Sequence, residues 1–166
     1  MDLEEFKFIF YMEWAHRMLG RFIGLTFIVP GLYFASKGLL NKSMILRSLI
    51  VGSLIGCQGI LGWYMVKSGL DDELLSNPYA VPRVSQYFLS AHLGSAFVIY
   101  ALMLSTGAGI IASNRGYRLS PIPLHLKSFM RYTHFTTGFV FITALSGAFV
   151  AGLDAGLVFI TNQDLQ

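Results

Sequence analysis

Residues 84–113 have the sequence VSQYFLSAHLGSAFVIYALMLSTGAGIIAS, in which His92 is the one acidic or basic side chain. A helix of this length rises about 45 Å, whereas the hydrocarbon core of a bilayer is about 30 Å thick. A helix on the surface of a soluble protein would also carry a charged face toward water. These residues therefore predict a membrane-spanning helix.

Three other segments also contain the 20 or so mainly apolar residues that a spanning helix needs. They are residues 8–40, 44–66 and 129–160. The links between the four segments are polar, and none is long or biased enough in composition to separate domains. We therefore expect an all-α fold, with a single transmembrane domain over residues 1–166 built as an integral membrane four-helix bundle.

The overall composition agrees with a lipid environment. Hydrophobic residues make up 54% of the chain and charged residues 13%, whereas a soluble domain is about 25% charged. The net charge of +3 comes from scattered basic residues, which argues against a nucleic-acid partner. The single cysteine, Cys57, excludes an intramolecular disulfide framework.

The charges also predict an orientation. If the helices alternate in direction, one side of the membrane receives all nine acidic residues and the other receives seven cations with no acid among them. These cations are Lys37, Lys42, Arg47, Arg115, Arg118, Lys127 and Arg131. By the positive-inside rule the cationic side faces the cytoplasm or matrix, and the acidic side faces the periplasm or intermembrane space.

Histidines at membrane depth are candidates for function, because ionisable groups are costly there. His16 lies near the outer end of the first helix and His92 near the outer start of the third, so alternation places both in the same leaflet. His134 enters the fourth helix from the opposite side, and His125 belongs to an inner loop. His16 and His92 are therefore the pair expected to ligate one haem iron.

The residues beside these histidines have two interpretations. Small residues one or two turns away leave room for a porphyrin face, or they form a helix–helix interface of the kind common in membrane bundles. They are Gly20, Gly24, Ser95 and Ala96. Zinc is less favoured than haem, since only two of its usual three or four ligands are present.

Glu13 precedes His16 by three residues and shares its helix face. Its carboxylate has three open roles: accepting the imidazole N–H, pairing with Arg17 at i+4, or transferring protons to a bound substrate. The glycines of the second helix favour a packing ridge. They are Gly52, Gly56, Gly59 and Gly62.

Four cations are expected at the outer ends of the first three helices. They are Arg17, Arg21, Lys67 and Arg83. Arginines there suit haem propionates, because the guanidinium fork matches a carboxylate. The alternative is contact with lipid headgroups or with neighbouring acids, which we favour for Lys67.

Four motifs in the chain resemble the haem A synthases of mitochondria and alphaproteobacteria. They are EWAHRMLGR at 13–21, QGILGWYMVKSGL at 58–70, VPRVSQY with AHLGS at 81–87 and 91–95, and TALSGAFVAGLDAG at 143–156. The resemblance extends from Glu5 to about Val158, and the motifs stand in the same order as in that family.

The resemblance implies a specific activity and site. Members of that family oxidise a methyl group of haem O to the formyl group of haem A, which cytochrome c oxidase uses. They have eight transmembrane helices in two similar halves, each half with one histidine pair. Matched to this chain, one pair falls on His16 and His92, and a carboxylate important for activity falls on Glu13. This half is expected to hold the substrate haem O, and the other half a haem b cofactor.

The chain also departs from the family pattern. The helix that precedes the Glu13 motif in the family is missing, as is everything after residues 143–156. We therefore expect family helices two to five only, in a fragment, partial gene product or short isoform that is inactive alone.

The resemblance also implies where the protein acts and with what. A multi-pass location in the mitochondrial inner membrane is expected, or the plasma membrane of a bacterium, with His16 and His92 toward the intermembrane space or periplasm. The implied partners are haem O, membrane lipid, haem O synthase, an electron-transfer protein and further copies of this chain.

Two other classes of function remain as alternatives. A non-enzymatic haem-binding or electron-transfer protein of cytochrome b type would use the same two ligands without modifying the haem. A transporter or assembly scaffold would use the histidines for packing or for proton movement.

Overall fold

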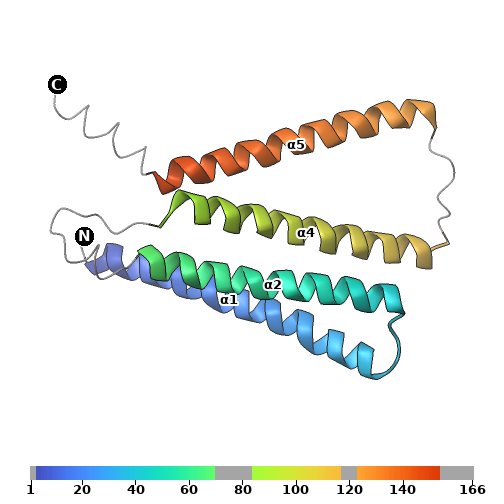
Figure 1. The fold of residues 1–166 in the computed structure, drawn as a ribbon, viewed down its shortest axis with the longest axis horizontal. Helices are drawn as coiled ribbons and strands as arrows, with labels where there is room; N and C mark the ends of the chain where they lie inside the picture. The colour runs from blue at the N-terminus through green and yellow to red at the C-terminus, as the bar shows by residue number, and fades with distance from the viewer. Residues whose placement is uncertain (1–2, 70–83, 117–122, 154–166) are drawn as a thin grey trace. The chain divides into compact units, whose positions relative to one another are not determined.

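The computed structural model describes residues 3–69, 84–116 and 123–153, which form four helices and no strand. These are α1 (Leu3–Ser36), α2 (Lys42–Gly69), α4 (Gln86–Asn114) and α5 (Leu124–Gly152), coloured from blue to red in Figure 1. Each of the four is long and apolar enough to cross a membrane. The prediction of an all-α membrane fold is confirmed.

The chain divides into two compact units, Met1–Gly59 and Ile60–Gln166. The first contains α1 and most of α2. The second contains the last part of α2 together with α4 and α5. The expectation that all four helices form one domain stays a prediction.

Helix α1 begins five residues before and ends four residues before the predicted bounds of about 8–40. The helix begins at Leu3, because Glu4 and Glu5 place negative charge in its first turn, where the helix dipole is positive. It ends at Ser36, because Gly38 adopts a left-handed backbone with φ 67°. The Gly38 N–H then donates to the Ala35 carbonyl at 3.0 Å, and the following N–H closes a Schellman motif.

The other helix ends also differ from prediction. Helix α2 begins two residues before the predicted 44, because the Asn41 side chain caps it by accepting the Met44 N–H at 2.9 Å. It continues to Gly69, three residues past the predicted 66, and α4 is shifted by one or two residues from the predicted 84–113. Helix α5 begins five residues before the predicted 129, where the Pro123 carbonyl accepts the Leu126 N–H at 2.9 Å. Residues 154–160 of its predicted span lie outside the described residues.

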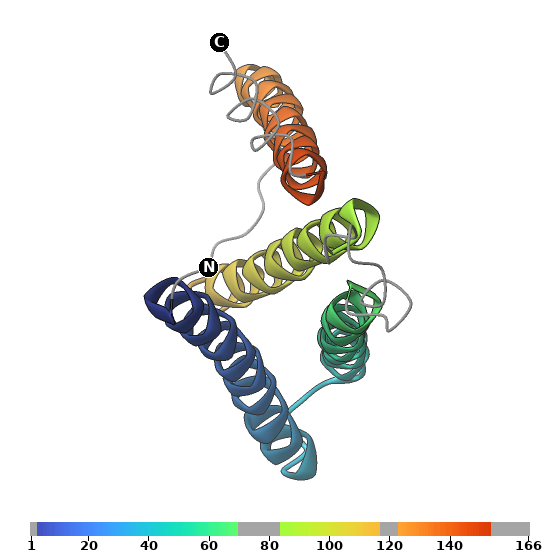
Figure 2. The same ribbon diagram turned by 90° about the vertical axis from the view of Figure 1, so that its left-hand side faces the viewer.

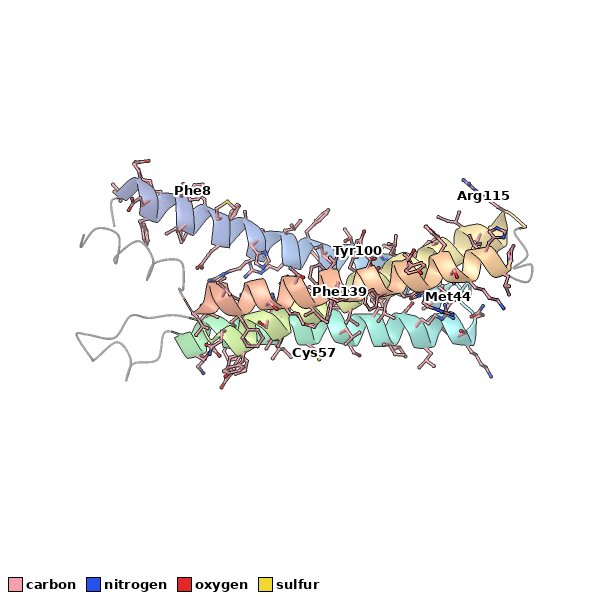
Figure 3. All side chains as sticks on the ribbon, turned by 90° about the horizontal axis from the view of Figure 1, so that it is seen from above. Phe8, Met44, Cys57, Tyr100, Arg115 and Phe139 are labelled. Atoms are coloured by element: carbon pink, nitrogen blue, oxygen red, sulfur yellow. The ribbon has the colours of Figure 1, made fainter. Side chains whose placement is uncertain are left out.

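Large apolar side chains project from every side of the helices, as Figure 3 shows. Phe8, Tyr100 and Phe139 are 67%, 64% and 57% exposed, and no residue of α1 is buried. A helix that is apolar all round needs a membrane or a protein core around it. With four such helices, the chain is a multi-pass membrane protein.

Helices α4 and α5 pack closely where α4 begins and α5 ends, and they separate toward the opposite end (Figures 1 and 2). Small residues of α4 allow this approach. The Ser90 hydroxyl donates to the Leu145 carbonyl at 3.4 Å, and a Cβ atom at Gly94 would lie 3.1 Å from the Leu145 side chain. Phe97 and Phe141 then meet edge to face, with ring centroids 6.1 Å apart.

The closest approach joins Gly152 of α5 to the first turn of α4. A Cβ atom at Gly152 would lie 2.6 Å from the Gln86 Cα atom, and backbone cannot move aside as a side chain can. We expect Gly152→Ala to destabilise the purified chain by about 1–3 kcal/mol, as overpacking does. A thermal melt in detergent measures this, with Gly147→Ala as control, since no described atom lies within 4 Å of a Cβ there. Equal melting temperatures for the two variants would contradict the contact.

Candidate functional site

The first unit places Glu13, His16 and Arg17 together on α1. Arg17 Nη2 donates to Glu13 Oε2 at 2.6 Å, so the i+4 ion pair is formed in the structure. The two side chains remain 58% and 52% exposed, and exposed pairs contribute only about 0.2–1 kcal/mol. Glu13 can therefore leave Arg17 for another partner at little cost.

Open space follows His16 along α1. Gly20 and Gly24 come one and two turns later, and no atom of the described residues lies within 4 Å of a Cβ built at either. Leu19 and Ile23 flank this strip with side chains that are 57% and 45% exposed. The surface beside His16 is thus flat at the two glycines, and the exposed apolar side chains of Leu19 and Ile23 border it.

The second unit places His92 of α4 against α2. A Cβ atom at Gly62 would lie 3.0 Å from His92 Cε1 and 3.6 Å from each ring nitrogen. Ordinary van der Waals contact for such atoms begins near 3.4 Å, so the ring occupies space that any side chain at residue 62 would need. The Nδ1 atom of His92 is shielded from solvent.

His92 and the α5 contacts lie on opposite faces of α4. Phe88 precedes His92 by four residues and shares its face, where it meets Tyr64 of α2 edge to face with centroids 5.2 Å apart. Ser90 and Gly94, which contact α5, are rotated by about half a turn. The His92 ring is therefore directed away from α5.

Some residues beside His92 already form contacts within the protein. The Ser95 hydroxyl donates to the Ala91 carbonyl at 2.6 Å, and Ile99 is only 8% exposed. Ala96 is exposed. Of Ser95, Ala96 and Ile99, Ala96 is the one left on an open surface of α4.

The other candidate residues are also placed, where the structure describes them. His134 donates from Nδ1 to the Met130 carbonyl of its own helix at 2.6 Å, and His125 is exposed near the start of α5. The Lys67 ammonium lies over the Trp63 ring, 5.1 Å from its centroid. Arg83, Arg118 and the acidic residues Asp71, Asp72, Glu73 and Asp154 lie outside the described ranges.

Across residues 3–69, 84–116 and 123–153, no group of three or more His, Cys, Asp or Glu side chains is arranged to hold a metal ion. His16 belongs to the first unit and His92 to the second. Their approach to one shared ligand stays a prediction.

Sequence reasoning missed the role of Gly62, because it assigned the whole glycine series of α2 to helix packing. Gly56 and Gly59 have no described atom within 4 Å of a built Cβ, whereas Gly62 meets the His92 ring. One signal was present in the chain. Gly62 lies seven residues before the end of α2, and His92 lies six residues after the start of α4.

Comparison with known proteins identifies what the chain is similar to. Residues 1–165 match the family described as Cytochrome oxidase assembly protein, COX15-CtaA. Heme A synthase COX15 of Homo sapiens is 52% identical over 159 residues, which cover 96% of this chain and 38% of the human protein. Heme A synthase of Nitrosospira multiformis is 44% identical over 161 residues, covering 97% of this chain and 42% of that protein.

A third relative has a composite name. The Heme A synthase-mitochondrial ferredoxin fusion protein of Schizosaccharomyces pombe is 41% identical over 177 residues, covering 99% of this chain and 29% of that protein. The chain thus spans about two fifths or less of the length of these relatives. No solved structure matches it.

Proposed function

Because the chain belongs to the Cytochrome oxidase assembly protein family, in which its matched relatives are named haem A synthases, we propose that it serves haem A synthesis by binding haem O between His16 and His92. The oxidation concerned converts a methyl group of haem O to the formyl group of haem A. The observation that supports a haem site between these residues is the position of each histidine within its own helix.

His16 lies 20 residues before the last residue of α1, and His92 lies 22 residues before the last residue of α4. These separations correspond to about 30 Å and about 33 Å along the helix axes. Both helices are followed by a glycine with a left-handed backbone, Gly38 and Gly116. If these two ends lie at one membrane face, the two imidazoles lie within about 3 Å of the same depth.

The donors and their surroundings suit a haem. Imidazole nitrogens are common axial ligands of haem iron. The strip at Gly20 and Gly24 leaves a flat surface beside His16 for one edge of a porphyrin, with Leu19 and Ile23 as apolar neighbours. At His92 of α4, the Gly62 backbone of α2 lies against the edge of the imidazole ring.

Glu13 is the proposed proton-handling residue. Converting the methyl group to a formyl group with oxygen from water releases four protons and four electrons. Glu13 is one helical turn from His16, and its weak pair with Arg17 leaves the carboxylate able to accept a proton. The electrons pass to an external one-electron carrier.

An iron–sulfur protein is the proposed class of electron carrier. The support is the fission yeast relative, whose name joins Heme A synthase to a mitochondrial ferredoxin. Contact with haem O synthase and association between copies of this chain stay predictions.

We further propose that His16 and His92 lie toward the intermembrane space or periplasm. Near the ends of α1 and α4 and the starts of α2 and α5, the described residues carry cations and no acid. These cations are Lys37, Lys42, Arg47, Arg115, Lys127 and Arg131. The positive-inside rule assigns such ends to the matrix or cytoplasm, and both histidines lie toward the opposite ends of their helices.

Titration of the purified chain with haem O in lipid nanodiscs tests the proposal. We expect one haem per chain, with the sharp visible bands of a low-spin haem that has two imidazole ligands. Conversion is tested in cells that make haem O and lack haem A synthase, by expressing the chain with the remaining part of the human relative and extracting the pigment. Absence of bound haem O in the titration would overturn the proposal.

A further inference from the structure

We propose that Gly62 is a positioning residue for His92. The missing side chain at Gly62 lets the edge of the imidazole lie against α2 and so sets the plane in which the ring presents a nitrogen to the iron. The part of this inference that concerns iron rests on the proposed function. The part that concerns the ring itself rests on the contact alone.

The contact with Gly62 involves the ring atom that is bonded to both nitrogens of His92. His92 Cε1 lies between Nδ1 and Nε2 and is the atom closest to the position of a Cβ at Gly62, at 3.0 Å. A methyl group there displaces the ring by a few tenths of an ångström, and both nitrogens move with it.

Neighbouring contacts oppose movement of the His92 ring away from α2. Tyr64, two residues after Gly62, and Phe88, four residues before His92, meet edge to face with an interplanar angle of 88°. On its opposite face α4 is held against α5 through Ser90 and Gly94. Helix α4 therefore cannot move away from α2 without disturbing its packing on α5.

Glycine lowers the stability of a helix, so its presence at residue 62 indicates a specific structural requirement there. Glycine inside a helix is about 1 kcal/mol less favourable than alanine. Gly59 lies in the same helix and has open space around a built Cβ, so alanine is tolerated there. At Gly62 the same replacement meets the His92 ring. The two positions form a matched pair for experiment.

Nuclear magnetic resonance tests the ring contact without haem. In the full chain labelled at histidine ¹³Cε1, the His92 signal is assigned by its loss in His92→Ala. We expect a nuclear Overhauser effect between His92 Hε1 and the Gly62 Hα atoms. Gly62→Ala should shift the His92 signal alone among the histidines, and Gly59→Ala should leave it unchanged. Absence of the Overhauser effect in the unmodified chain would overturn the inference, whatever the stability of the variants.

Haem O binding tests the positioning role. Residues that orient a metal ligand typically change affinity by 10–100-fold, so we expect Gly62→Ala to weaken haem O binding by about tenfold or more. The g values of the low-spin ferric haem should also change, because they depend on the imidazole planes. Gly59→Ala should alter neither property. If Gly62→Ala shifts the His92 signal but leaves affinity and g values unchanged, the positioning role is wrong.

The two failures are distinguishable. If the unmodified chain binds no haem O, the proposed function fails, and the effect of Gly62 on iron ligation fails with it. The resonance experiment then still decides whether Gly62 holds the His92 ring. If haem O binds normally and the His92 signal is the same in Gly62→Ala, this inference alone is wrong.

Discussion

His92→Ala should remove the low-spin haem spectrum from the chain and lower its affinity for haem O by more than about 100-fold, which exceeds the usual effect of residues that only orient a ligand. The reason is that the variant lacks one of the two proposed axial donors, and the methyl group of alanine has no donor atom to replace it. Difference absorption spectra during titration with haem O measure both quantities. His16→Ala should give the same loss, because the proposed site has both imidazoles on one iron.

His134→Ala is the matched control for these variants. His134 also lies in a membrane helix, but its Nδ1 atom is bonded to the Met130 carbonyl of its own helix at 2.6 Å. The haem spectrum should therefore be unchanged. Added imidazole should partly restore the spectrum of His92→Ala, since removal of the ring opens space against Gly62. Retention of an unaltered bis-histidine spectrum in His92→Ala would refute the ligand pair.

Glu13→Gln should leave haem O binding in place and lower haem A formation by about 100-fold or more, the usual contribution of a general acid or base. Glutamine has nearly the same size as glutamate but cannot accept a proton at neutral pH. Pigment extraction from the cells described for the conversion test measures the product. The bound-haem spectrum of the same variant shows whether the substrate is still held.

Arg17→Gln separates proton handling from the ion pair. This variant removes the partner at 2.6 Å but keeps the Glu13 carboxylate. If Glu13 handles protons, haem A formation should fall strongly in Glu13→Gln and only weakly in Arg17→Gln. Equal losses in the two variants would mean that the ion pair itself is the important feature, and full activity of Glu13→Gln would exclude Glu13 from the reaction.

The four helices were predictable from sequence because bilayer thickness sets the length of an apolar segment. Their ends were not, because hydropathy reports which residues tolerate lipid and not where the backbone turns. Leu39 and Leu40 are apolar and were assigned to the first helix, although Gly38 ends it with a left-handed turn. Asn41 as a helix cap was likewise a local signal that the apolar pattern did not include.

The candidate site was predictable to different degrees. The Glu13–Arg17 pair followed from i+4 spacing, which any helix provides. The contact between Gly62 and His92 did not follow, because glycines that pack helices and glycines that hold a ring have the same pattern in sequence. The feature that distinguishes Gly62 is its separation from the end of α2, seven residues, which nearly matches the six residues between the start of α4 and His92.

The approach of Gly152 to Gln86 has a consequence for interpreting genetic variants. Gln86 lies six residues before His92 on one continuous helix, a separation of about 9 Å. A bulkier residue at position 152 pushes on the backbone of that first turn, and a rigid helix carries the displacement to the imidazole. A substitution at residue 152, distant in sequence from the proposed ligand His92, should therefore change the colour of bound haem O as well as the yield of folded protein.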